Sequence, residues 1–241
     1  MPRSPLVSTV EMRAGRPTLL LNGTPHTPLI YALTDCPGAR WTWEEVPARN
    51  IWLFGQQGVR LFQVDLWFEQ MLGEDDRLDI TLARKQIAGV LAACPEGAVM
   101  IRLHVNAPAW WLAQHPDEAV GYADVPVSES EPWGLVRRVG TDGDTPIRAS
   151  FASTLWYDWI TAHLRNFCTQ LAATPEGAGL FSIQLANGLY GEWHQFGFLH
   201  HDPDTGVAAT KSYRAWLRAC YGSDDKLAAA WILQAALDSL R

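Results

Sequence analysis

The chain alternates between short apolar runs and longer segments whose apolar positions recur with helical spacing. Four apolar runs have the length of buried strands and are bounded by polar or turn-forming residues: 28–35, 59–68, 98–106 and 180–186. Strands that are apolar at almost every position are covered on both faces, which is typical of parallel sheets. The pattern therefore predicts four parallel strands in the core.

A helical segment follows each of these strands. The predicted helices cover residues 47–58, 80–94, 151–173 and 207–222. Asp79 is the expected N-cap of the second helix. The third helix has a predicted inward stripe of Trp156, Ile160, His163, Phe167 and Leu171. The fourth has an inward set of Tyr213, Trp216, Leu217 and Cys220, and a last short helix carries Leu227 and Trp231.

The segment before the first strand predicts a β-hairpin, because Asn22-Gly23 separates Leu19–Leu21 from a second extended segment. We therefore predict an α/β fold, a partial TIM (β/α)8 barrel of about four βα units preceded by a short hairpin. Residues 1–27 would form the hairpin segment, and residues 28–241 the first half of the barrel. Because a closed barrel of this type has eight units, the chain is expected to be a fragment, a truncated product or half of an assembly.

A doubly wound nucleotide-binding fold has the same order of elements, but it needs a glycine-rich phosphate loop after its first strand. Residues 34–41 fill that junction and contain neither GxGxxG nor a P-loop, so a nucleotide-dependent enzyme is disfavoured. Residues 107–150 are rich in Pro, Gly and Asp and have little periodicity. Loops of that length in a compact domain are usually functional.

The charge balance and the cysteine content limit the classes of partner and the cellular compartment that we expect for the protein. The 26 acidic residues outnumber the 19 basic ones, and a net charge of -7 argues against nucleic acid and membrane partners. The four cysteines are far apart and form no CxxC pair, which indicates a reducing cytoplasm and no metal knot. We expect no cofactor, a cytoplasmic location and no signal peptide, and self-association into a homo-oligomer stays open.

The segment 184–197 is the most informative one for chemistry, because it follows the fourth strand and combines glycines, a carboxylate and aromatic residues. Aromatic neighbours that shield Glu192 from water would raise its pKa towards neutrality, as a general acid requires. An exposed Glu192 with incidental aromatic neighbours is the equally open alternative. The 12 tryptophans leave a similar choice between core packing and stacking on sugar rings.

Polar side chains stand at the ends of the other three strands as well. His104 and Asn106 follow the third strand and precede Trp110 and Trp111. The second strand ends with Asp65, Trp67 and Glu69, and the first with Asp35. A single His after a strand is more often a structural hydrogen-bond partner, but one polar group at each of four strand ends indicates a binding site there.

These segments resemble the clan A (β/α)8-barrel glycoside hydrolases, most closely the N-terminal part of the catalytic barrel of family 42 β-galactosidases. The resemblance rests on Asn-Ala-Pro-Ala-Trp-Trp-Leu at 106–112, His-Pro-Asp-Glu at 115–118, Tyr-Gly-Glu-Trp at 190–193 and the strands at 28–35 and 59–68. It implies a retaining hydrolase of β-glycosides such as β-galactosides, with an acid/base carboxyl after the fourth strand and a nucleophile after the seventh. It makes Glu192 the candidate acid/base, with Asn187 beside it to position a sugar hydroxyl.

The chain departs from that pattern in two ways. Gly188 follows Asn187 where the family has Glu, and Glu192 comes four positions later. The region that would hold the nucleophile is missing, and nothing favours Glu69 as its substitute, so we expect this chain alone to be inactive. The expected catalytic group is Glu192, and the expected substrate-binding groups are Asp35, Asp65, Trp67, His104, Asn106, Trp110, Trp111, Asn187, Tyr190, Trp193 and His194. The alternative is a non-catalytic sugar-binding protein or a truncated barrel.

Overall fold

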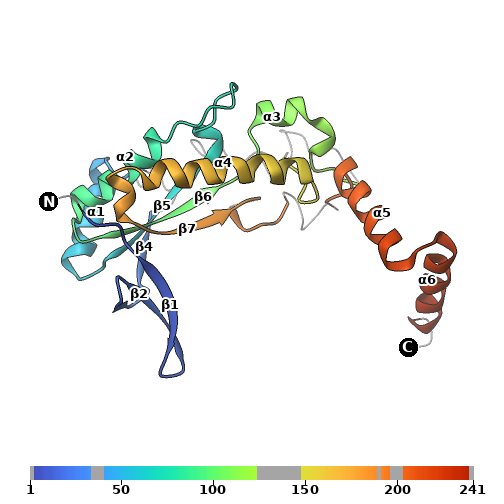
Figure 1. Ribbon diagram of the computed structural model, residues 1–241, viewed down its shortest axis with the longest axis horizontal. Coiled ribbons are helices and arrows are strands. Elements are labelled where there is room, and N and C mark those ends of the chain that lie inside the picture. The colour runs from blue at the N-terminus through green and yellow to red at the C-terminus, as the bar shows by residue number, and fades with distance from the viewer. Residues whose placement is uncertain (1–2, 34–40, 124–147, 189–190, 196–202, 239–241) are drawn as a thin grey trace.

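Two separate sheets form the framework of the computed structural model, which describes residues 3–33, 41–123, 148–188, 191–195 and 203–238, with side chains to residue 232 (Figure 1). The larger sheet has the order β4-β5-β6-β7, and all its neighbouring strands are parallel. Its strands are β4 (Ile30–Ala32), β5 (Leu61–Trp67), β6 (Ala98–His104) and β7 (Leu180–Ala186). The four parallel strands that the apolar runs predict are therefore confirmed.

The central pair, β5 and β6, is in register along its whole length, from Leu61 opposite Ala98 to Trp67 opposite His104. All seven residues of β5 are buried, as expected of a strand that is covered on both faces. Side chains alternate between the faces of a strand, so Phe62, Val64 and Leu66 share one face.

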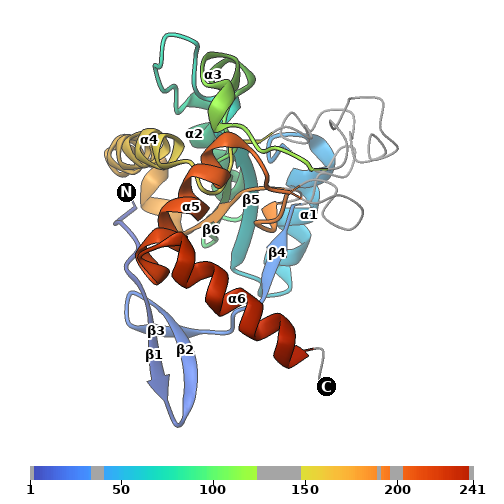
Figure 2. The ribbon, with the colours of Figure 1, turned by 90° about the vertical axis from the view of Figure 1, so that its right-hand side faces the viewer.

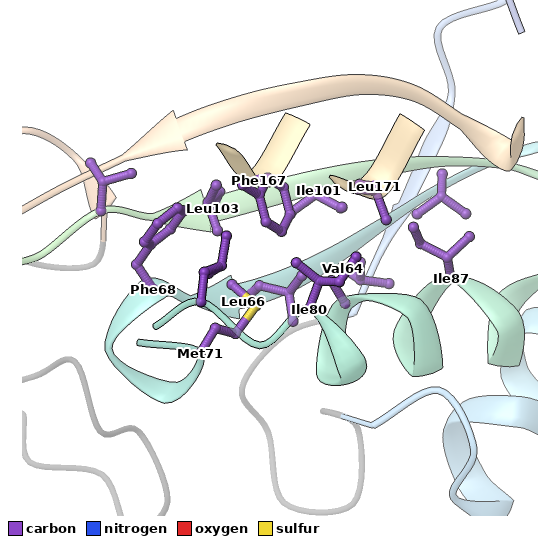
Figure 3. Packing of buried hydrophobic residues seen from close by; sticks show 14 of the residues in the cluster. Val64, Leu66, Phe68, Met71, Ile80, Ile87, Ile101, Leu103, Phe167 and Leu171 are labelled. Atoms are coloured by element: carbon purple, nitrogen blue, oxygen red, sulfur yellow. The ribbon is translucent and has the colours of Figure 1, made fainter. Parts of the chain in front are cut away.

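Three helices cover that face of the sheet: α1 (Glu45–Gln56), α2 (Thr81–Ala93) and α4 (Thr154–Ala172). Their inward side chains form the main hydrophobic core with alternate residues of β5 and β6. Figure 3 shows Phe167 and Leu171 of α4 beside Ile101 of β6. The inward stripe predicted for α4 is confirmed, because its five residues are the buried residues of the helix.

An antiparallel sheet of β1 (Ser8–Arg13), β2 (Arg16–Leu21) and β3 (Thr24–His26) packs at the start of the parallel strands. Its contact is a small cluster of Leu21 with Leu61, Ala98 and Phe181. The predicted hairpin is confirmed: Asn22 and Gly23 join β2 to β3 with φ of 50° and 78°, the left-handed values of a two-residue hairpin turn. β1 was not predicted, since all its residues are exposed and no buried face marks it.

Two further details of the helices differ from the prediction. A short helix, α3 (Ala109–Gln114), and a 3-10 turn, η2 (Pro116–Glu118), lie inside the segment predicted to be irregular. Helices this short carry little periodicity, so the pattern misses them. The N-cap of α2 is Ile80 rather than Asp79, although the Asp79 carboxylate accepts the Thr81 N–H at 2.8 Å and still stabilises the helix start.

The last two helices, α5 (Val207–Tyr221) and α6 (Asp224–Asp238), project from the sheet along the long axis of the molecule (Figure 1). Figure 2 looks along that axis and shows both of them in front of the sheet. The predicted inward face of α5 is wrong: Tyr213 and Trp216 are 51% and 55% exposed, Cys220 is exposed, and Leu217 is half-buried. The spacing finds an apolar face correctly, but cannot tell whether another element covers it.

The described part of the chain thus has an α/β fold with four parallel strands. The assignment to a partial TIM barrel and the division at residue 27 stay predictions. Among the described helices, none combines the length and the apolar character needed to cross a lipid bilayer.

The core between α4 and the sheet generates a first prediction. Phe167→Ala leaves a cavity at a fully buried position and should lower the free energy of unfolding by about 3–5 kcal/mol. Leu155→Ala is the matched control on the same helix, because Leu155 is 44% exposed and its truncation should change stability by about 0.5 kcal/mol. Equilibrium unfolding in urea measures both. Equal effects of the two changes would contradict the packing described here.

Candidate functional site

The carboxyl ends of β5 and β6 place two flat rings against each other. Trp67 and His104 are in register, and their rings stack with centroids 4.6 Å apart and planes 9° from parallel. Both side chains are buried. They lie on the sheet face opposite the three helices, because they alternate with Leu66 and Leu103, which are part of the main core. Two of the predicted site residues thus form a rigid platform at the strand ends.

Two asparagines connect the loops that follow β6 and β7. The Gly188 N–H donates to Oδ1 of Asn106 at 3.1 Å and to Oδ1 of Asn187 at 2.7 Å. Both asparagine side chains are only 2% exposed. Nδ2 of Asn187 is buried and has no hydrogen-bond partner among the described residues. Its amide N–H groups therefore have unused hydrogen-bonding capacity.

The loop after β7 folds back over the strand ends. The Trp193 N–H donates to the Asn187 carbonyl at 2.8 Å, and the turn uses left-handed backbone at Gly188, Gly191 and Trp193. A Cβ on Gly191 would lie 2.8 Å from the Ala186 Cβ and 3.0 Å from Cε1 of His104. Only glycine allows this approach, so the loop lies directly against the platform of Trp67 and His104.

Glu192 follows Gly191 in this loop, which comes after the carboxyl end of β7. Its carboxylate lies 3.2 Å from Nε2 of His194, and its side chain is 68% exposed. Of the two alternatives left open for Glu192, the structure has the exposed side chain and not the one shielded by aromatic neighbours. The reason is the turn at Trp193: its Nε1 donates to the Leu185 carbonyl at 3.0 Å, and its ring packs on Phe151 with centroids 5.8 Å apart.

Asp65 is buried in the middle of the same sheet face, where its carboxylate forms a bidentate ion pair with Arg102. One of the two bonds joins Nε of Arg102 to Oδ1 of Asp65 at 2.8 Å, and the two residues are register partners. Bidentate guanidinium–carboxylate pairs are strong and fix geometry. The negative charge of Asp65 is therefore paired with Arg102 inside the sheet. This pairing gives Asp65 a positioning role rather than the role of a free carboxylate that contacts substrate.

Trp110 and Trp111 lie on α3 and pack against α4. Trp111 is buried in the main core, with its ring 5.6 Å from Trp159 and 4.5 Å from His115. Trp110 meets Trp159 edge to face at 5.9 Å. Core packing is thus the role that the contacts support for these two tryptophans. Asp35 and Tyr190, also predicted to bind substrate, lie outside the described residues.

The sequence did not predict two features next to these groups. Asp76 accepts a hydrogen bond from Nε1 of Trp159 at 2.9 Å and lies 3.0 Å from Nε2 of His163, which ties the loop before α2 to α4. Gln195, at the end of the loop after β7, is buried with both ends of its amide unpaired within the described part of the chain. Neither has a motif, and only the folded backbone brings them to these places.

No metal centre is visible within the described ranges, because no group of three or more His, Cys, Asp or Glu side chains there could hold a metal ion. The described cysteines are Cys94, which is buried, and Cys168 and Cys220, which are exposed, and all three are free thiols. The polar groups of the candidate site are the amides of Asn106 and Asn187, the Glu192–His194 pair and the Asp65–Arg102 ion pair.

Comparisons with known proteins support the α/β fold of the chain. No family model matches the sequence, and curated protein sequences contain no match either. Among solved structures, the chain is similar to the crystal structure of a β-galactosidase from the psychrophilic Marinomonas ef1, with a TM-score of 0.56 and 16% identity. The match covers 84% of this chain and 26% of that chain. At this identity the similarity shows the fold alone, and the chain spans about a quarter of that β-galactosidase chain.

The ion pair in the sheet generates a second prediction. Arg102→Met leaves the Asp65 carboxylate buried without its charged partner and should lower the free energy of unfolding by about 3 kcal/mol. The double variant Asp65→Leu with Arg102→Met should recover most of that loss.

Arg13→Met is the control for charge removal, because the Arg13–Glu11 pair is half exposed and should contribute less than about 1 kcal/mol. Thermal and urea unfolding measure all three variants. If Arg102→Met costs no more than Arg13→Met, the buried Asp65–Arg102 pair stabilises the fold no more than an exposed pair does.

Proposed function

We propose that this chain is the first half of a glycoside hydrolase barrel of the β-galactosidase kind. The carboxyl ends of β5, β6 and β7 would bind a β-glycoside there, and Glu192 is the candidate acid/base. The observation that carries the proposal is the convergence of Trp67, His104, Asn106 and Asn187 at one edge of the sheet. Active sites of (β/α)8 barrels lie at this end of the strands.

Exposed apolar side chains at both edges of the sheet support the partial barrel. Next to β4, Trp52, Leu53 and Phe54 of α1 are 50%, 43% and 42% exposed, although Phe54 stacks on Tyr31. On β7, Leu185 is 43% exposed. Exposed apolar surface of this kind usually marks a place where another element packs. Further βα units on these edges would bury it and close the barrel.

The chemistry that these residues support is proton transfer. Glu192 at the strand end can donate a proton to a glycosidic oxygen, while His194 at 3.2 Å orients its carboxyl. Retention also requires a second carboxyl about 5–5.5 Å from the first. Asp65 does not meet this need, because its charge is bound to Arg102. We propose that further βα units of the barrel supply the nucleophile, so this chain alone should bind without hydrolysing.

Sugar binding without catalysis is the second candidate function, and the exposure of Glu192 favours it. General acids of glycosidases are usually desolvated, which keeps them protonated at neutral pH. A side chain that is 68% exposed lacks that environment in this chain. Further barrel units packed over the loop could shield Glu192 from water. The two candidate functions therefore differ in whether such units complete the site.

Binding generates the third prediction. Wild-type protein should bind methyl β-galactoside, and Asn187→Ala should weaken the affinity about tenfold because a buried amide donor to a sugar hydroxyl is lost. Asn166→Ala on the exposed face of α4 is the matched control and should leave the affinity unchanged. Isothermal titration calorimetry measures the three proteins. Absence of binding to the wild type would overturn the proposal.

Hydrolysis generates the fourth prediction. The chain alone should release nitrophenol from nitrophenyl β-galactoside at the background rate, and Glu192→Gln should change neither that rate nor the affinity for methyl β-galactoside by more than about twofold. A rate above background that Glu192→Gln abolishes would show that the chain already contains a complete pair of reacting groups.

A further inference from the structure

Gln195 is a buried residue that no step described above uses. Its side chain is 6% exposed, and neither Nε2 nor Oε1 has a hydrogen-bond partner within the described residues. Buried amides are nearly always paired at both ends, and each exception needs an explanation. We infer that Gln195 binds the substrate in this site, with its amide donating to one sugar hydroxyl and accepting from another. The inference rests on the proposed function.

The fold of the loop brings Gln195 back to the end of β7. The Trp193 N–H donates to the Asn187 carbonyl. His194, which follows Trp193, packs so closely on Gly188 that a Cβ on Gly188 would lie only 2.2 Å from the His194 carbonyl oxygen. Gln195 therefore follows a turn whose two ends touch. The turn is fixed in place by the bond from the Gly188 N–H to Asn106.

Two residues of this loop carry side-chain amide atoms that lack hydrogen-bond partners within the described ranges. Asn187 contributes a buried Nδ2, and Gln195 contributes a buried Nε2 and Oε1. Together they offer donors and an acceptor without a formal charge. A ligand that satisfies them must both accept and donate hydrogen bonds, as adjacent hydroxyls of a sugar ring do. A carboxylate ligand can only accept and an ammonium can only donate, so neither could pair all three atoms, whereas a neutral polyhydroxy ligand could.

A bound water could also satisfy the Gln195 amide, and the amide would then be structural. The two roles make opposite predictions for Gln195→Met, which keeps the length of the side chain and removes both hydrogen-bonding ends. If the amide has no partner until a ligand binds, the variant removes an unsatisfied buried group. Its melting temperature should then equal that of the wild type or exceed it by about 2–4 °C. If a water satisfies the amide, the melting temperature should fall.

The test combines that melting measurement with calorimetric titration of methyl β-galactoside. We expect Gln195→Met to weaken binding about tenfold without loss of melting temperature. Gln56→Met, at an exposed position of α1, is the matched control and should change neither quantity.

The outcomes separate the inference from the proposed function. Wild-type binding with unchanged affinity in Gln195→Met overturns the role of Gln195 and leaves the proposed function standing. A lower melting temperature in Gln195→Met shows a structural amide and also overturns that role. A wild type that does not bind methyl β-galactoside overturns the proposed function, and with it the assignment of a sugar to Gln195.

Discussion

The core, the buried ion pair and the stacked rings all require one register between β5 and β6. A shift of one residue would turn every side chain of β5 to the opposite face of the sheet. It would bring Phe62, Val64 and Leu66 out of the helix-covered core and separate Asp65 from Arg102 and Trp67 from His104. Core packing, the buried ion pair and the ring platform all require the same alignment. Stability and the candidate site therefore share one origin.

Hydrophobic spacing predicts the elements that carry this register. Local pattern alone predicts the five buried residues of α4 and the Asn22-Gly23 hairpin. Both features are determined by residues that are close in the sequence. The exposed face of α5 does not follow from it, since burial depends on which distant element lies opposite. The hydrophobic pattern does not predict β1 for a related reason, because none of its residues is buried.

The candidate site is likewise predictable from the sequence only in part. Strand-end positions predict that His104, Asn106 and Asn187 stand at one edge, because parallel strands end together. The exposure of Glu192 and the burial of Gln195 depend on three left-handed residues in one loop, whose path no spacing rule gives. The pairing of Asp65 with Arg102 is likewise a consequence of register, which the separate strand segments do not specify.

The loop after β7 joins fold and function, because its close approach to His104 requires Gly191 and its return leaves buried amides unsatisfied. Such unpaired groups reduce stability in the free protein, and a ligand that pairs them gains the corresponding affinity. The polar composition of the strand ends, with one buried charge already neutralised by Arg102, suits a neutral sugar better than an ionic ligand.

A crystal structure of the chain soaked with methyl β-galactoside would locate the bound sugar. We expect one sugar ring at the carboxyl ends of β5, β6 and β7, with its hydroxyls within about 3.2 Å of the Asn187 and Gln195 amides. A sugar bound elsewhere, or ordered waters that pair both amides while the soaked sugar is absent, would contradict it.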